Sequence, residues 1–125
     1  MKKSIWVIII ILALGIFGYY GITAFVIKGN TLSSEFGQCL IDNGAIFYGA
    51  EWCNHCQSQK EMLGRNVVKV LYDNQGYIEC PENQKLCESK GITGYPTWII
   101  NGTKYEGIQS IELLSSITSC ELSYE

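Results

Sequence analysis

A short apolar run that leads into two closely spaced cysteines restricts the fold of this chain more than any other feature of its sequence. The run, Ala45–Ala50, contains two aromatic residues and is typical of a buried strand. Cys53 and Cys56 follow it. Cys53 is expected to open a helix that runs to about Leu63 and ends at Gly64. A strand, a Cys-x-x-Cys motif and a helix in this order indicate an α/β domain.

Cap and turn residues divide the rest of the domain into further elements. Before the apolar run, Thr31 or Ser33 can cap a helix that ends at Asn43-Gly44. After the motif, residues 65–75 fit either a short helix or an extended segment, and residues 76–80 predict a strand.

The last part of the chain predicts a helix, a hairpin and a final helix. Pro81 is expected at the first position of a helix that stops at Gly91. Asn101-Gly102 is typical of a type I′ turn and predicts a hairpin over residues 97–107, after which Ser110 can cap the last helix. The order α-β-α-β-α-β-β-α predicts a central mixed sheet flanked by helices, the thioredoxin-like arrangement.

Residues 1–28 are predicted to form a transmembrane anchor, which leaves residues 29–125 for the thioredoxin-like domain. Ser4–Ile27 carries no charged residue, and a helix of this length is about 36 Å long, enough to cross a ~30 Å hydrocarbon layer. Trp6 and Tyr19-Tyr20 are placed to lie near the two interfaces.

The charges around the anchor favour one orientation. Lys2 and Lys3 favour a cytoplasmic N-terminus, although Lys28 on the other flank weakens this bias. We expect a single-pass protein of the cell membrane with its domain on the periplasmic or extracellular side. A cleaved signal peptide is the alternative, but its apolar core is usually about 7–15 residues, shorter than this one. Either interpretation places the domain in an oxidising compartment.

Net charge and metal-ligand spacing argue against two other classes of protein. Beyond residue 28 the chain has 6 basic and 12 acidic residues, so a nucleic-acid partner is not expected. A zinc site needs four ligands, and Cys53, His55 and Cys56 lie too close together to supply a set unaided. We predict no metal, although a copper chaperone-like module using Cys53 and Cys56 is an alternative.

The chemistry of the motif favours thiol–disulfide exchange. The thiolate is the nucleophile, and a helix N-terminus at Cys53 stabilises an anion there. Cys56 can then resolve a mixed disulfide within the chain. Protonated His55 is a further source of stabilisation for the thiolate, and a stabilised thiolate makes the disulfide more oxidising. The redox-active disulfide is the only redox group expected, with no other cofactor.

Two segments carry a resemblance to a known family. Residues 48–57 and 91–102 resemble the thioredoxin-like domain often fused to homologues of vitamin K epoxide reductase, and the similarity spans roughly Phe36 to Cys120. It implies disulfide exchange with the thiols of exported proteins. It also implies that Cys53 attacks, Cys56 resolves and Pro96 is a cis-proline facing them.

The chain departs from that family and from thioredoxins in two respects. It has one predicted spanning helix in place of the four-helix, quinone-linked membrane domain, so a separate membrane partner resembling vitamin K epoxide reductase is expected to recharge it. Prototypical thioredoxins have a buried acid six residues before the first active cysteine, and Phe47 holds that position here. A reductase-type proton relay is therefore not supported.

Client recognition and the direction of electron flow follow from neighbouring residues. The turn at Tyr95-Pro96 would leave Tyr95 backbone groups free to pair with an extended substrate, and Trp52 would offer an apolar platform to unfolded clients. A histidine before the second cysteine also resembles periplasmic disulfide oxidases. We therefore favour an oxidase, with a disulfide reductase or isomerase as the alternative.

The remaining four cysteines are predicted to form structural disulfides. Cys80 ends a strand and Cys87 lies on the next helix, so they can close a local loop. Cys39 and Cys120 are expected at the pole opposite the motif, where the first and last helices of the domain end. A role for Cys80–Cys87 in relaying electrons is the alternative to a structural one.

Overall fold

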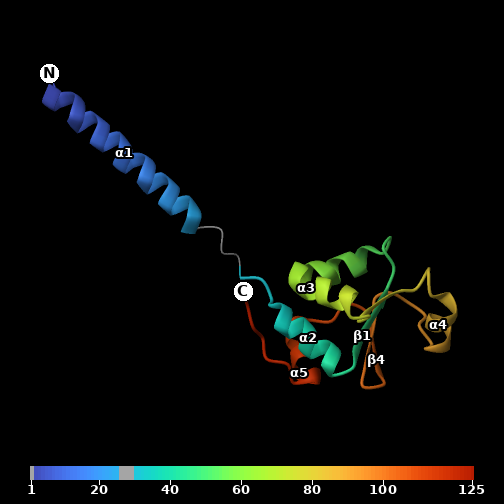
Figure 1. Ribbon diagram of the computed structural model, residues 1–125. Coiled ribbons are helices and arrows are strands. Elements are labelled where there is room, and N and C mark those ends of the chain that lie inside the picture. Colours follow the sequence, from blue (N-terminus) through green and yellow to red (C-terminus); the bar gives the residue numbers. More distant parts are fainter. Residues whose placement is uncertain (1, 26–29) are drawn as a thin grey trace. The chain divides into compact units, whose positions relative to one another are not determined.

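The computed structural model describes residues 2–25 and 30–125 (Figure 1). The chain divides into two units, residues 1–30 and residues 31–125. The predicted anchor ends at Lys28, and this boundary lies outside the described residues.

The first unit contains the helix α1 (Lys2–Phe25). Every side chain from Lys3 to Tyr20 is exposed. Residues 3–20 make this the one helix, among the described residues, that is long and apolar enough to cross a membrane. A signal sequence near an N-terminus has the same properties.

The second unit is built on a four-stranded mixed sheet in the order β2-β1-β3-β4. β1 pairs in parallel with β2 and antiparallel with β3, and β3 pairs antiparallel with β4. The strands are β1 (Ala45–Gly49), β2 (Tyr77–Glu79), β3 (Thr97–Ile100) and β4 (Thr103–Glu106). Helices flank this sheet, and the predicted α/β, thioredoxin-like fold is confirmed (Figure 1).

Strand register decides which side chains share a face of the sheet. Phe47 lies opposite Tyr77 on one side and Trp98 on the other, and all three belong to the main hydrophobic core. Tyr48 points to the other face, where it packs with the Cys80–Cys87 disulfide. The main core is the face covered by α2 (Ser34–Asp42) and α3 (Asn54–Asp73), which pack on each other.

Helix α2 begins and ends at the residues that its sequence indicates. The Ser33 side chain caps it by accepting a hydrogen bond from the Phe36 amide, and Gly44 after its end has a φ of 71°. Leu32 precedes this helix. Its backbone forms a bridge with Tyr124 near the C-terminus, and its side chain is buried there.

Helix α3 continues beyond the residue at which we expected it to end. Gly64 has non-helical angles, φ 79° and ψ 163°, and produces a kink rather than a stop. The segment that was ambiguous in sequence is helical because Val67 and Leu71, one turn apart, are both buried in the core.

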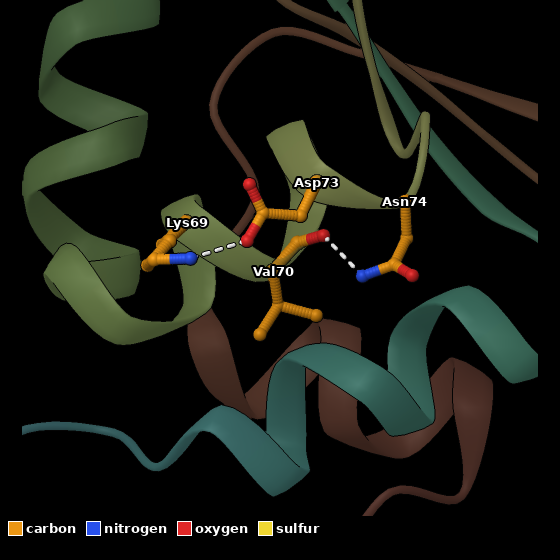
Figure 2. Close-up of polar contacts among 4 residues, drawn as sticks. All are labelled: Lys69, Val70, Asp73 and Asn74. Carbon is orange, nitrogen blue, oxygen red and sulfur yellow. Dashed lines mark hydrogen bonds and ion pairs between the residues drawn. The ribbon is translucent and has the colours of Figure 1, made fainter.

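The last turn of α3 is held by side chains on its exposed face (Figure 2). Lys69 pairs with Asp73 four residues later, and the Asn74 side chain donates to the Val70 carbonyl oxygen at 2.9 Å. The Val70 carbonyl oxygen also accepts from the Asn74 backbone N–H, so Asn74 closes the last turn of the helix before the chain turns into β2.

The prediction that Pro81 opens a helix is wrong. Helix α4 spans Gln84–Ser89, and Pro81 lies in a turn before it. The carbonyl oxygen of Glu79 accepts hydrogen bonds from the backbone N–H groups of Glu82 and Asn83 and from the Asn83 side chain. These bonds hold the chain in a turn and delay the helix.

The C-terminal elements follow their local signals. Asn101 and Gly102 both have positive φ, as a type I′ turn requires, and they join β3 to β4. Ser110 caps α5 (Ile111–Thr118) by accepting from the Leu113 amide, and Leu114 is buried in the main core.

Candidate active site

The Cys-x-x-Cys motif lies where β1 gives way to α3, and Cys53 is the N-cap of that helix. The Cys56 amide donates to the Cys53 sulfur at 3.2 Å, so the sulfur occupies the place of a capping oxygen. Both cysteines are unbonded, and Cys53 is 8% exposed whereas Cys56 is fully buried. The sulfur at the helix N-terminus is therefore the one that a second molecule can reach.

A second loop approaches Cys53 from the other side. The Tyr95–Pro96 peptide bond is cis, as the resemblance implied, and Pro96 is buried. The Cys53 thiol lies 3.7 Å from the Tyr95 carbonyl oxygen, to which it donates. The backbone before the proline thus forms one wall of the site.

The two loops enclose a surface cavity of about 590 Å³ lined by residues 52–55 and 92–95. Trp52 is 72% exposed and meets the Tyr95 ring edge to face, with centroids 5.9 Å apart. His55 is exposed in the first turn of α3 and also lines the cavity. The structure therefore gathers Trp52, Cys53, His55 and Tyr95 around one opening.

Cys56 lies on the inner side of the motif, away from that cavity. Burial, followed by the hydrogen bond with Cys53, raises the pKa of the Cys56 thiol to about 12. A backbone hydrogen bond from Ala50 and the positive charge of Lys60 act in the opposite direction. Cys56 is therefore a protonated thiol at neutral pH.

Aromatic rings occupy the space behind the motif. Phe47 is fully buried, stacked on Trp98 at 4.9 Å and edge to face with Tyr77 at 5.1 Å. The position at which thioredoxins hold an acid is therefore apolar, as the sequence indicates.

The sequence analysis did not identify a buried polar side chain among these aromatic rings. Gln59 is fully buried on α3 and accepts from the Trp98 indole N–H at 3.2 Å and the Gln109 amide at 2.7 Å. Its own amide donates to the Gln109 carbonyl oxygen at 3.0 Å. The only signal in the sequence is its helical spacing from Cys56 and Leu63, which places a polar side chain on the buried face.

Tyr77 and Glu79 were also missed as neighbours of the motif. The Tyr77 hydroxyl donates to Glu79 Oε2 at 2.6 Å, and Glu79 Oε1 accepts from the Glu51 amide at 3.0 Å. The Lys60 ammonium lies 4.2 Å from the centre of the Tyr77 ring. Only the pairing of β2 with β1 brings these groups to the motif.

The other four cysteines form two disulfides. Cys39 in α2 is bonded to Cys120 after α5, and Cys80 after β2 is bonded to Cys87 in α4. Among residues 2–25 and 30–125, no group of three or more His, Cys, Asp or Glu side chains could hold a metal ion.

Comparison with known proteins gives relatives of one kind. No protein-family model matches the chain. Thiol-disulfide oxidoreductase LTO1 of Arabidopsis thaliana is 40% identical over 87 residues, which cover 63% of this chain and 22% of that protein. Protein disulfide isomerase-like 2-2 of Oryza sativa subsp. japonica is 35% identical over 103 residues, which cover 74% of this chain and 27% of that protein.

A third relative extends the same pattern. Probable protein disulfide-isomerase A6 of Medicago sativa is 32% identical over 91 residues, covering 64% of this chain and 25% of that protein. The chain thus spans about a quarter of the length of the curated relatives it matches. The mixed sheet and its flanking helices give residues 31–125 a thioredoxin-like fold, and the similarity to these relatives supports the same fold.

Proposed function

We propose that this chain is a membrane-anchored thiol–disulfide oxidoreductase that exchanges disulfides with exported proteins. The observation that carries the proposal is the position of Cys53, at the N-terminus of α3 and at the edge of a cavity whose other wall is the Tyr95–Pro96 loop. The names of the relatives, oxidoreductase and protein disulfide isomerase, support the same chemistry.

The difference in exposure between the two cysteines supports a reacting role for Cys53 and a resolving role for Cys56. In the oxidative direction, a client thiolate attacks the Cys53 sulfur of the Cys53–Cys56 disulfide, and Cys56 leaves with the bonding electron pair and takes up a proton. A second client thiolate then attacks the client sulfur of the mixed disulfide and releases Cys53 as a thiolate. The client gains a disulfide and this chain gains two electrons.

The helix N-terminus and His55 favour this direction. The N-terminus of α3 stabilises negative charge on Cys53, and the imidazolium form of His55, two residues away, would add to that effect. A stabilised thiolate leaves readily and makes the disulfide a stronger oxidant. Recharging would come from a quinone-linked membrane partner resembling vitamin K epoxide reductase, positioned by the α1 anchor in the cell membrane.

The exposed rings around Cys53 suit an unfolded client. Trp52 and Tyr95 offer apolar surface beside the reactive sulfur, and an extended chain can pair with the backbone of the Tyr95 loop. Two of the relatives described above are named as isomerases, so a reductase or isomerase on the same scaffold is the second candidate.

Trapping in cells tests the proposal. The Cys56→Ala variant removes the resolving thiol, so Cys53 should hold mixed disulfides with exported proteins and with a multispanning membrane protein. The matched control, Cys53→Ala, retains one thiol of the same motif but should trap neither. Trapping of cytoplasmic proteins alone would reject the location and the oxidase direction, and an equal yield from both variants would reject the assignment of Cys53.

A second measurement distinguishes a copper-binding module from the proposed oxidoreductase. Stoichiometric copper binding by the reduced full-length chain, without oxidation or reduction of a model client, would favour a copper chaperone-like module instead. Separation of membranes from soluble material, with protease treatment of intact cells, tests the anchor and the side on which the domain lies.

A further inference from the structure

Cys56 is a protonated thiol, and the Cys-x-x-Cys motif itself contains no group that is placed to accept its proton. In any half-reaction that re-forms the Cys53–Cys56 disulfide, Cys56 must attack as a thiolate. Burial, the largest cause of the raised pKa of Cys56, also acts when Cys53 is in a mixed disulfide, so the Cys56 thiol is mostly protonated at pH 7. The thiol therefore needs a proton acceptor, and Phe47 at the thioredoxin acid position cannot serve.

The Tyr77 hydroxyl on β2 and the Cys56 sulfur border the same position of β1. A Cβ built on Gly49 would lie 3.1 Å from the Cys56 sulfur and 3.2 Å from the Tyr77 hydroxyl oxygen. The sulfur and the phenol oxygen thus converge on the same side-chain-free position of β1. Gly49 leaves the space between them clear of a side chain.

The Tyr77 hydroxyl has an onward partner. It donates to Glu79 Oε2 at 2.6 Å, and the backbone N–H of Glu51, two residues before Cys53, fixes the other carboxylate oxygen. Tyr77 is 7% exposed whereas Glu79 is partly exposed, so the pair runs from the core to solvent. Burial and the bond to Glu79 raise the pKa of Tyr77, which therefore remains a neutral phenol at neutral pH.

We propose that Tyr77 and Glu79 carry the proton of the Cys56 thiol to and from solvent. When Cys56 attacks a mixed disulfide at Cys53, its proton passes to the Tyr77 oxygen while the Tyr77 proton passes to Glu79 Oε2. Cys56 forms the S–S bond, the client or partner leaves as a thiolate, and Glu79 releases the proton to water. When Cys56 is the leaving group, the same steps run in reverse.

Lys60 assists the transfer electrostatically. Its ammonium faces the Tyr77 ring from α3, donates to the Tyr72 hydroxyl at 2.8 Å, and favours the Cys56 thiolate. The ionisable groups that act on Cys56 and Tyr77 come from two elements, α3 and β2. They are Cys53, Lys60 and Tyr72 from the α3 side, and Glu79 from β2.

This proposal rests on the proposed function, and one experiment separates the two. The full-length chain in detergent micelles, reduced at Cys53 and Cys56 only, is mixed with the aromatic disulfide dithiobis(nitrobenzoate). Attack by Cys53 releases one coloured nitrothiolate, and resolution by Cys56 releases a second. The first phase reports Cys53, and the second reports the step that needs the proton acceptor.

Tyr77→Phe removes the hydroxyl and keeps the ring that packs on Phe47. We expect the second phase to slow by about 100-fold at pH 7, the lower end of the usual contribution of general acid–base catalysis, with the first phase unchanged. Its rate should then rise about tenfold per pH unit as direct ionisation of Cys56 takes over. Glu79→Gln should slow the same phase.

Tyr48→Phe is the matched control, because Tyr48 is a buried tyrosine of the neighbouring strand that faces the other side of the sheet. It should leave both phases and their pH profile unchanged. A second phase of wild-type rate in Tyr77→Phe, or equal slowing by Tyr48→Phe, would overturn the proton transfer. Absence of the first phase in the wild-type chain would instead overturn the proposed function.

Discussion

Replacing Gln59 by leucine should destabilise the domain more than any comparable exchange on α3. The side chain is fully buried and makes three hydrogen bonds, to the Trp98 indole and to the backbone N–H and C=O of Gln109. Leucine is similar in size but can pair with none of these groups. The substitution therefore leaves three buried polar groups without the partner they have now.

The magnitude follows from those three groups. Each unpaired group costs about 1–3 kcal/mol, and the avoided desolvation of the glutamine amide returns roughly the cost of one such group. The net loss in the free energy of unfolding is then about 4 kcal/mol. For a domain of this size that corresponds to a fall in Tm of roughly 15–30 °C.

Urea unfolding of the full-length chain in micelles, followed by tryptophan fluorescence, to which buried Trp98 contributes, measures this loss. The control is Gln57→Leu, two positions earlier in the same helix, where the exposed amide makes one bond to the Glu51 carbonyl oxygen that water can replace. We expect less than about 1 kcal/mol there. If the two variants were equally stable, the assignment of Gln59 as a bridge between α3, β3 and the Gln109 loop would be refuted.

Three further predictions concern cysteines and charge. Replacing both Cys39 and Cys120 by alanine should lower the free energy of unfolding by up to about 4.5 kcal/mol, and replacing Cys80 and Cys87 should lower it by about 2.5 kcal/mol, because loop-closure entropy grows with loop length. Urea unfolding measures both losses, and equal losses would contradict this entropic argument. His55→Ala should make the reduction potential more negative, by about 30 mV for each 1.4 kcal/mol of lost thiolate stabilisation, in equilibrium with glutathione; an unchanged value would contradict that role. Since the pKa of Cys56 is raised from 9.0 to about 12 in the folded state, the reduced domain should lose stability as pH rises from 9 towards 12. Cys56→Ala should lose less stability over this range in unfolding measured against pH, and the loss that remains comes from Tyr48 and Tyr77, whose pKa values burial also raises; an unchanged loss would contradict the role of Cys56.

Local rules account for the parts of the fold that sequence predicted well. Ser33 and Ser110 cap helices through contacts within three residues of themselves, and Asn101-Gly102 forms its turn with the positive φ that those residues tolerate. The same is true of Cys53, because a strand before it and a helix after it define its position. Such features need no knowledge of distant segments.

The errors arise where contacts outside the predicted helix override the signals within it. Gly64 was expected to end a helix, but burial of Val67 and Leu71 makes it favourable for the chain to resume the helix after a kink. Pro81 was expected to begin one, but backbone and side-chain bonds to the Glu79 carbonyl hold that segment in a turn. In both cases the deciding partners lie outside the helix as it was predicted.

The same reasoning explains why half of the site was visible in sequence and half was not. Phe47 could be identified from its distance to Cys53, and its apolar side chain indicated that the thioredoxin acid is missing. Tyr77, by contrast, lies in a short segment whose spacing from the motif says nothing about register. Once β2 pairs with β1, Tyr77 stands directly opposite Phe47, on the same face of the sheet.

That register changes what the loss of the acid means. On β1, Phe47 stands where thioredoxins hold their acid, but a phenol bonded to a carboxylate is present on the adjacent strand, and its oxygen and the Cys56 sulfur border the same position at Gly49. If the Cys56 thiol must release its proton during turnover, the chemistry requires an acceptor near it, not an acid at a fixed place in the sequence. Phe47 at the thioredoxin acid position is therefore weak evidence against proton transfer at this site, because the pairing of β1 with β2 brings Tyr77 and Glu79 next to the motif.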